Sequence, residues 1–388
     1  MDFSFKAEEL AVLKEVQALI KEEVTPELVQ ESLNTGLIYG APKAREFIQK
    51  LGSRGLLTPD WPEKYGGRGT SEMVTYLIRD ELAYALTPYI FVGAHMAGPA
   101  ILKYGTEEMK QKYLLSIARG EIEFALGYTE PAAGSDLAAM SMEAEDRGDY
   151  YLVNGQKTFN THSHVADYHW LAARTDFDAP KHRGISLFIV DLKSPGIQVR
   201  PMITMAGWQT NEVYYNDVMV PKENLVGDPN RGFYYIMTAL DYERMVPPGA
   251  YRRLFDGIAA YARETKKGGD YLSKDPLVRQ KLAQMATELE ICELLYYQLP
   301  CMLEQEKPTG YMSSMEKLFV TEVMQRVAEA GMEILGLFGQ LEKGSAKVPL
   351  DGMVELFSRW SVVETIYGGT SEIQKNIMAL RGLKLPIK

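Results

Sequence analysis

The sequence has little cysteine. Only two cysteines occur in 388 residues, Cys292 and Cys301, and both fall in a helix-like region. Two cysteines cannot build the disulfide framework that holds small secreted domains together. This usage is typical of a reducing compartment, so we expect a cytoplasmic protein.

An excess of positive charge and long apolar runs are also missing. The net charge is −10 at pH 7 and no cluster of Lys and Arg occurs, which argues against nucleic acid as a partner. No apolar run approaches the roughly 20 residues that a membrane-spanning helix needs. The N-terminal residues show no apolar signal segment. We therefore expect neither a membrane span nor a secretory signal.

The rest of the composition is that of a globular protein, with 46% hydrophobic and 24% charged residues. A chain of this length can hold two or three domains. Helical periodicity dominates at first, β-favouring runs follow, and helical periodicity then returns. We expect an α+β protein with an N-terminal all-α domain (1–122), a middle β-barrel or sandwich domain (123–228) and a C-terminal four-helix bundle (229–388).

Two predictions concern local structure. Asn154-Gly155 lies between β-favouring residues and predicts a hairpin turn. Phe159 and Thr161, two residues apart, are expected on one face of a strand. In the C-terminal part the periodicity predicts four long helices, at about 229–264, 275–306, 311–340 and 350–385.

Three stretches place small residues beside polar ones, which lets a backbone approach a ligand. GYTEPAAGSDLAA (127–139) has the glycine and hydroxyls of a binding loop but also of an ordinary polar loop. NGQKTFNTHSH (154–164) has a ring and a hydroxyl that suit a flat heterocycle or simple core packing. In ETIYGGTSEIQ (364–374) two glycines precede a helix start and offer backbone N–H groups to a polar or anionic ligand.

The second stretch ends with His162 and His164, and His169 follows it. Neither a cysteine nor a clear carboxylate partner accompanies them, so we expect strand or loop residues and no metal site.

A charged cluster, LDYERM, lies inside the predicted helix 229–264. Such a cluster is usually a solvated face or an i,i+3 ion pair. A carboxylate buried among these apolar neighbours would instead have a raised pKa, which suits a general base near neutral pH. Asp241 and Glu243 are about 200° apart around a helix, so they should point to different sides.

Taken in order, these stretches resemble the acyl-CoA dehydrogenase family over nearly the whole chain. YTEPAAGSD is similar to the family's T-E-P-x-A-G-S-D loop, KTFNT to its K-x-W-I-T strand, and IYGGTSEIQ to its I-Y-E-G-T-x-E-I-Q loop. The α–β–α order matches as well. The resemblance implies FAD, an acyl-CoA substrate, an electron-transferring flavoprotein as oxidant, and a tetramer that is a dimer of dimers.

The resemblance also implies site residues. Thr129 would bond the pyrimidine part of the flavin, Phe159 would stack on the ring, and Thr161 would bond near N5. Ser135 would meet the CoA arm. The Gly368 N–H would polarise the thioester carbonyl, a role that needs no side chain. The full expected cofactor set is Leu126, Tyr128, Thr129, Gly134, Ser135, Phe159, Thr161, Gly336, Thr370 and Glu372; the substrate set is Ser135, Asp241, Arg244 and Gly369.

The catalytic base is implied by a departure from the family pattern. The family often has a glutamate, its base, where Gly368 stands. Isovaleryl- and long-chain members carry the base on a helix instead, in a setting like LDYER. The resemblance therefore makes Glu243 the base, with Arg244 orienting it or the CoA arm. Those relatives handle branched or long chains, and 19 Met and 23 Tyr could line an adaptable pocket, so we expect a bulky, branched or alicyclic acyl group.

Three other departures keep alternatives open. Phe159 replaces the usual Trp. The family's R-x-x-F-G reads TKKGG, with Thr265 and Gly268 in place of Arg and Phe, and its Q-x-x-G-G-x-G begins with Glu333, which cannot donate as an amide does. The chain could thus be a cofactor-poor or half-catalytic subunit beside a paralogous chain, or run side-branch chemistry such as desulfination or flavin monooxygenation. The retained T-E-P-x-A-G-S-D pattern and Glu243 favour a dehydrogenase.

Overall fold

The computed structural model describes residues 4–243 and 245–386; of residues 238–239 and 241–243 it describes the backbone alone. The chain forms two compact units. Unit 1 comprises Met1–Thr75 and Thr87–Glu243, and unit 2 comprises Tyr76–Leu86 and Arg244–Lys388. Helix α4 (Glu72–Tyr84) starts in unit 1 and continues in unit 2.

Unit 1 begins with helices, as predicted. Thr25 caps α2 by accepting the Leu28 N–H at 3.3 Å, and Pro26 supplies a preset φ at the first helical position. Two segments, Gly93–Ala97 and Lys110–Leu114, are wound as π-helix. The α-helices of this part are α1 (Ala7–Glu23), α2 (Pro26–Asn34), α3 (Pro42–Ser53), α5 (Gly98–Tyr104), α6 (Glu107–Met109) and α7 (Leu115–Ala118).

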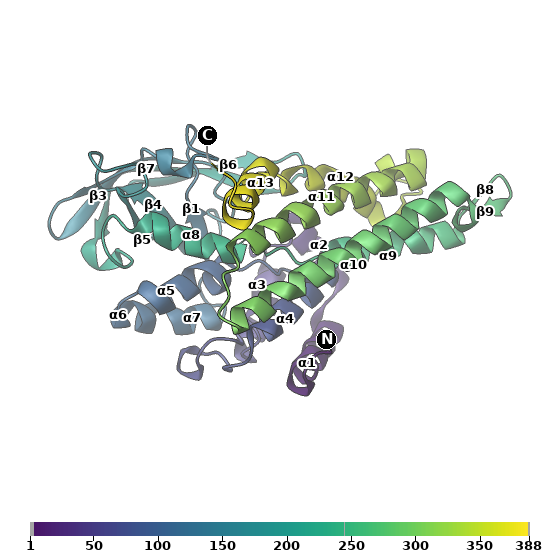
Figure 1. The fold of residues 1–388 in the computed structure, drawn as a ribbon, viewed down its shortest axis with the longest axis horizontal. Helices are drawn as coiled ribbons and strands as arrows, with labels where there is room; N and C mark the ends of the chain where they lie inside the picture. The colour runs from purple at the N-terminus through teal and green to yellow at the C-terminus, as the bar shows by residue number, and fades with distance from the viewer. Residues whose placement is uncertain (1–3, 244, 387–388) are drawn as a thin grey trace. The chain divides into compact units, whose positions relative to one another are not determined.

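A seven-stranded sheet follows in unit 1, and α8 (Gly232–Glu243) ends the unit (Figure 1). Strand β4 pairs in parallel with β1 and antiparallel with β5, while β3 lies between β2 and β7, and β6 pairs with β7. The inward side chains of β2, β3, β4, β5 and β7 form one hydrophobic core. The strands are β1 (Phe124–Gly127), β2 (Glu143–Asp146), β3 (Tyr150–Lys157), β4 (Tyr168–Arg174), β5 (Ile185–Asp191), β6 (Ile197–Ile203) and β7 (Gln209–Pro221).

The hairpin turn predicted at Asn154-Gly155 is wrong, because β3 runs through both residues. Opposite Asn154 the partner strand β7 carries an extra residue, a β-bulge, and Asp217 adopts a φ of 52° there. The Asn154 side chain accepts the Asp217 N–H at 2.8 Å and donates to its carboxylate at 3.1 Å. The polar Asn-Gly pair thus supports a bulge on the neighbouring strand instead of reversing its own strand.

Phe159 and Thr161 also differ from the prediction, since neither lies in a strand. β3 ends at Lys157, and the next amide, that of Thr158, donates to the Thr129 carbonyl at 2.9 Å. Phe159 then takes a φ of 56°, outside the β region, and the chain turns. Both residues therefore lie on a loop that joins β3 to β4.

Unit 2 is helical, and α9, α10 and α11 lie side by side (Figure 1). A two-stranded hairpin, β8 (Lys266–Lys267) with β9 (Asp270–Tyr271), joins α9 to α10. Leu254, Ile258 and Val327 are fully buried in the unit's core. The helices are α9 (Gly249–Glu264), α10 (Pro276–Glu304), α11 (Gly310–Leu335), α12 (Met353–Glu364) and α13 (Ser371–Ile377).

Two of the four predicted C-terminal helices are each two helices. The segment 229–264 breaks between α8 and α9, where Pro247 and Pro248 lack N–H groups and disfavour helix before them. The described residues of this cluster, 240–243, therefore end a helix instead of lying inside one. The segment 350–385 breaks at Gly368 and Gly369, which take φ values of 61° and 94°. The α–β–α order is confirmed, whereas the domain boundaries at 122 and 228 stay predictions. None of the described helices combines the length and apolarity of a membrane span.

Candidate active site

The first predicted site segment, 127–139, contains a tight loop after β1, residues 128–136, here called the 128–136 loop. Glu130 and Ala133 exchange two backbone hydrogen bonds of 3.1 Å each, which closes the turn around Pro131 and Ala132. Gly134 and Ser135 are exposed on it. Asp136 forms an exposed ion pair with Lys181 at 2.7 Å. The loop therefore presents small residues and a hydroxyl on a fixed backbone.

A buried ion pair connects the 128–136 loop to the end of β3. Lys157 Nζ donates to the Glu130 carboxylate at 2.8 Å and to the Tyr128 carbonyl at 3.0 Å. The two side chains are 0% and 4% exposed. Glu130 also accepts the N–H groups of Ser141 and Met142. Burial opposes ionisation of Glu130, but the Lys157 ammonium and these N–H donors hold its pKa below the ordinary value.

Sequence reasoning missed this pair, although both residues are letters of the matched motifs. The pair holds the 128–136 loop against the end of β3. Glu130 and Lys157 fix the two segments, and the Thr158 N–H donates to the Thr129 carbonyl at 2.9 Å, so the residue before Phe159 lies beside Thr129. The Phe159 ring is 63% exposed, which is unusual for a phenylalanine. Thr129 is half-buried.

Three further predicted residues of unit 1 are Thr161, Leu126 and Tyr128. The Thr161 hydroxyl shares a 3.2 Å hydrogen bond with the Thr210 hydroxyl, which orients it. Leu126 is half-buried in β1, and Tyr128 is buried.

Two of the three histidines, His162 and His169, are buried, whereas His164 is exposed. His169 Nδ1 lies 2.7 Å from the Tyr215 hydroxyl, and His164 Nδ1 lies 3.1 Å from the Asn211 amide. Neither ring nitrogen of His162 has a described partner. Burial lowers the pKa of His162 and of His169 to about 3, so both rings are neutral. Among the described residues no three His, Cys, Asp or Glu side chains are grouped to hold a metal.

In unit 2 the stretch 366–370, here called the glycine loop, joins α12 to α13. The Gln374 side-chain amide donates to the Gly368 and Gly369 carbonyls at 2.9 and 3.0 Å. Lys317 Nζ, whose residue is fully buried on α11, donates to the Gly369 carbonyl at 2.9 Å. The N–H groups of Gly368, Gly369 and Thr370 donate to no acceptor within the described part of the chain. The loop thus binds inward through its carbonyls and leaves three amides for a ligand.

A buried acid lies at the base of this loop. Glu364 is 2% exposed and accepts a hydrogen bond from the Tyr367 hydroxyl. Burial raises the pKa of Glu364 to about 7, although Tyr367 and Lys317 oppose the shift. The Lys317 ammonium also lies 5.7 Å from the centre of the Tyr367 ring. The loop is therefore anchored by buried polar groups.

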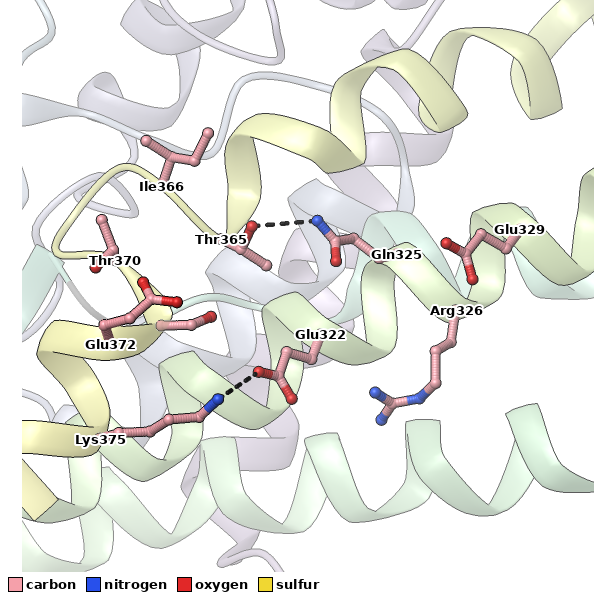
Figure 2. A pocket seen from close by; sticks show the side chains of 10 residues that line it. Glu322, Gln325, Arg326, Glu329, Thr365, Ile366, Thr370, Glu372 and Lys375 are labelled. Carbon is pink, nitrogen blue, oxygen red and sulfur yellow. Dashed lines mark hydrogen bonds and ion pairs between the residues drawn. The ribbon is translucent and has the colours of Figure 1, made fainter. Parts of the chain in front are cut away.

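A cavity of about 470 Å³ lies beside the glycine loop, between α11 and the start of α13 (Figure 2). Two predicted residues, Thr370 and Glu372, line it. Figure 2 also shows Gln325 donating to the Thr365 hydroxyl, at 3.1 Å, and Lys375 paired with Glu322 at 3.6 Å. Thr370 caps α13 by accepting the Ile373 N–H. The lining is mostly polar and includes residues that are absent from the expected cofactor and substrate sets: Glu322, Gln325, Arg326, Glu329, Thr365, Ile366, Ser371 and Lys375.

The predicted base and its neighbours lie partly outside the described residues. Glu243 and Asp241 belong to the last turn of α8, but the description does not include their side chains; Arg244 is not described at all. Their predicted roles stay predictions.

The altered motifs of unit 2 have definite structures. TKKGG forms the β8–β9 hairpin, with Gly268 and Gly269 at its tip at φ values of 63° and 98°. Glu333 forms an ion pair with Lys281 of α10, so its negative charge is already matched within the chain. Gly336 ends α11 with a φ of 59° and is exposed.

Comparison with known proteins decides the family. The models of the N-terminal, middle and C-terminal acyl-CoA dehydrogenase domains match residues 6–121, 125–218 and 230–383. The chain belongs to the acyl-CoA dehydrogenase family. It is therefore an FAD-dependent oxidoreductase that acts on acyl-CoA, as the sequence predicted.

Relatives match this acyl-CoA dehydrogenase over its whole length. Acyl-CoA dehydrogenase FadE26 of Mycobacterium tuberculosis is 35% identical, over 100% of this chain and 99% of that protein. The caffeyl-CoA reductase-Etf complex subunit CarC of Acetobacterium woodii is 31% identical, over 97% and 98%. The solved structure of the Tcur3481-Tcur3483 steroid ACAD is 35% identical, with a TM-score of 0.93 over 100% of both chains.

The described residues fit FAD. In unit 1 an exposed aromatic ring, Phe159, stands beside hydroxyl groups and suits a flat ring system. In unit 2 the glycine-loop amides and the polar cavity, with Arg326 and Lys375 among its lining, suit the polar parts of a dinucleotide. These groups are accessible without breaking a hydrogen bond of the described structure, because the Phe159 ring is exposed and the glycine-loop amides donate to no described acceptor.

Proposed function

We propose that this acyl-CoA dehydrogenase introduces an α,β double bond into a bulky, branched or alicyclic acyl-CoA and passes the electrons to an electron-transferring flavoprotein. Bound FAD supplies the redox chemistry by accepting the β-hydrogen as hydride. Thr129, Phe159 and Thr161 would hold the flavin ring, and Thr370 and Glu372 would hold polar parts of the cofactor. Leu126, Tyr128, Gly134, Ser135 and Gly336 complete the proposed cofactor contacts.

The observation that carries the proposal is the hydrogen bonding of the glycine loop. Gln374 and Lys317 hold its carbonyls, and the Gly368 N–H has no described acceptor. A fixed N–H of this kind stabilises the negative charge that develops on a thioester oxygen when the α-proton leaves. Gly369 contacts the substrate at the same point, and Ser135 meets the CoA arm.

Glu243 is the proposed base, since no carboxylate stands at position 368. Its carboxylate takes the α-proton, and Asp241 and Arg244 contact the substrate or orient the base. Removal of this proton builds the electron density that expels the β-hydrogen, so the two bond cleavages assist each other.

The bulky substrate is supported by two features. Glycine at 368 leaves the space that a glutamate side chain would fill. In addition, one matched structure is described as a steroid ACAD. The electron acceptor is supported by CarC, a subunit of an Etf complex.

Anaerobic flavin reduction tests this function. We expect at least one of butanoyl-, isovaleryl-, palmitoyl-, cyclohexanecarbonyl- and cholyl-CoA to bleach the flavin absorbance, with the bulkier thioesters acting fastest. Glu243→Gln should retain FAD and thioester binding but slow the bleaching by about 10²–10⁴-fold, because the general base is lost. Glu264→Gln, an exposed glutamate at the end of α9, serves as the control and should keep the wild-type rate. A wild-type rate in Glu243→Gln would show that another group is the base.

A second candidate is a subunit of a heteromer, in which FAD binding needs a paralogous chain. The TKKGG hairpin and the Lys281-paired Glu333 favour it, because both replace family residues that donate to the cofactor. Native mass spectrometry of the chain expressed alone distinguishes the candidates. A tetramer with one FAD per chain excludes an obligatory partner, whereas FAD-poor protein that fills when a paralogue is added supports one.

A further inference from the structure

One peptide group in unit 2, between Met245 and Val246, is held on both edges by buried side chains. Arg79 Nη2 of α4 donates to the Met245 carbonyl at 3.1 Å. The Val246 N–H donates to the Glu316 carboxyl of α11 at 3.2 Å. The peptide is trans, so its C=O and N–H point in opposite directions, and the two contacts fix its orientation.

Both side chains are deep in the protein. Arg79 is 7% exposed and Glu316 is 1% exposed. Placing ionisable groups in such surroundings costs several kcal/mol for each ionised group. Burial raises the pKa of Glu316 well above its usual range, while the Val246 N–H and Arg79 oppose the shift. An ordinary helix end needs no such groups, because water or a short capping side chain satisfies its free N–H and C=O.

The held peptide lies in the break between α8 and α9. Pro247 and Pro248 follow it, with fixed φ angles and no N–H groups. The prolines therefore restrict the backbone on the α9 side of the held peptide. Glu243 is two residues before Met245, within about 8 Å by Cα spacing along the chain.

We propose that Glu316 and Arg79 are positioning residues for Glu243. They fix the Met245–Val246 peptide, which begins two residues after the last residue of α8, and so restrict the chain that leads away from Glu243. The proposal rests on the proposed function, in which Glu243 is the base. It extends that function to two residues that no sequence motif marks. A misplacement of about 1 Å in a reacting group can cost about 10²-fold in rate, so fixing this peptide can affect catalysis measurably.

The central experiment compares two substitutions at one position. Glu316→Met removes the acceptor and keeps the length of the side chain, while Glu316→Gln keeps an acceptor oxygen for the Val246 N–H. The probe is whichever of the five thioesters above reduces the wild-type flavin fastest. At saturating thioester we expect Glu316→Met to slow flavin reduction by about 10–100-fold. Its thioester Kd and FAD content should stay within about threefold of wild type, and Glu316→Gln should retain the wild-type rate within the same margin.

Two further readouts separate positioning from general destabilisation. Amide hydrogen exchange of a peptide covering 245–246 should be faster in Glu316→Met and in Arg79→Met than in wild type. Glu355→Met is the matched control, since Glu355 is 13% exposed and pairs with Arg359 at 2.9 Å elsewhere in unit 2. It should leave both the flavin-reduction rate and the exchange of 245–246 unchanged.

The outcomes are distinct. A wild-type rate in Glu316→Met, or an equal loss in Glu355→Met, overturns the positioning role while the proposed function stands. An equal loss in Glu316→Gln overturns the acceptor role. If Glu243→Gln keeps the wild-type rate, or no thioester reduces the flavin, the proposed function fails and the positioning role fails with it.

Discussion

Unit 1 and unit 2 each contain proposed FAD contacts, and each unit supports its own contacts in a different way. Unit 1 offers side chains, the Phe159 ring and the Thr129 and Thr161 hydroxyls, and supports them with the buried ion pair of Glu130 and Lys157. Unit 2 offers backbone amides of the glycine loop. There Lys317 and Gln374 bind the loop carbonyls from inside.

The two units should differ in which amino-acid substitutions they tolerate. A ligand-facing side chain can be exchanged, as Phe159 for Trp indicates, provided that the ion pair behind it persists. A ligand-facing amide cannot be exchanged by mutation, so its position depends on backbone conformation and on the groups that hold the carbonyls. We therefore expect the proposed contacts of unit 1 to depend mainly on the Glu130–Lys157 ion pair. Those of unit 2 should depend mainly on the backbone conformation of the glycine loop.

The largest effect is expected from Lys157→Met, which leaves the Glu130 carboxylate buried without its ammonium partner. Breaking such a pair costs about 3–5 kcal/mol. We expect a marked fall in the urea midpoint, with loss of FAD. Lys181→Met removes the exposed pair of the same loop and should cost at most about 1 kcal/mol. Equal unfolding midpoints for the two variants would contradict the electrostatic support.

A difference in pH dependence comes next. The pKa of Glu364 is raised by burial to about 7, so the folded protein holds a proton that the unfolded chain releases above pH 4.5. Stability from Glu364 is therefore greatest at acid pH and falls as pH rises to about 7, by roughly 3 kcal/mol. The lowered pKa of Glu130 acts in the opposite sense, and its contribution is lost as pH falls below about 4.5.

Urea unfolding from about pH 3 to 8 measures both contributions. Relative to wild type, Glu364→Gln should gain stability as pH rises from 4.5 towards 7, and Glu130→Gln should lose stability as pH rises towards 4.5. Slopes of the same sign for these two variants would refute the assignment.

The smallest effect compares two glycines. A Cβ on Gly369 would lie 2.7 Å from Gln374 Nε2 and would require a φ of 94°, whereas a Cβ on Gly134 would meet nothing within 4 Å. We expect Gly369→Ala to cost about 1–2 kcal/mol and to slow flavin reduction, because the carbonyl anchor is displaced. Gly134→Ala should change the melting temperature of the flavin-free protein little. A melting temperature lowered equally by both would contradict the conformational support of unit 2.

The sequence predicted the α–β–α order and the motif segments well, because these depend on periodicity and on local residue types. It did not predict the supports. Glu130 and Lys157 are 27 residues apart, and Lys317 is 52 residues from Gly369, so only the fold brings them together. The break at Pro247 and Pro248 was readable from proline chemistry alone. Whether Asn154-Gly155 makes a turn or supports a bulge depends on the partner strand, which local propensity does not encode.

The bulge on β7 has a consequence for recombination among relatives. Before it, Val213 and Tyr215 face the core; after it, Val218 and Val220 do, so the in–out alternation changes phase at Asn216 and Asp217. The Asn154 side chain completes this shift from another strand. A chimera that takes β3 from one parent and β7 from another can lose the match between Asn154 and the bulge. A one-residue deletion at 216–217 would restore plain alternation in β7, with its valines still facing the core, but would remove the position that Asn154 binds. Residue 154 and residues 216–217 should therefore be taken from the same parent. Because Asn154 and Asp217 are 63 residues apart, a linear alignment does not show that they belong together.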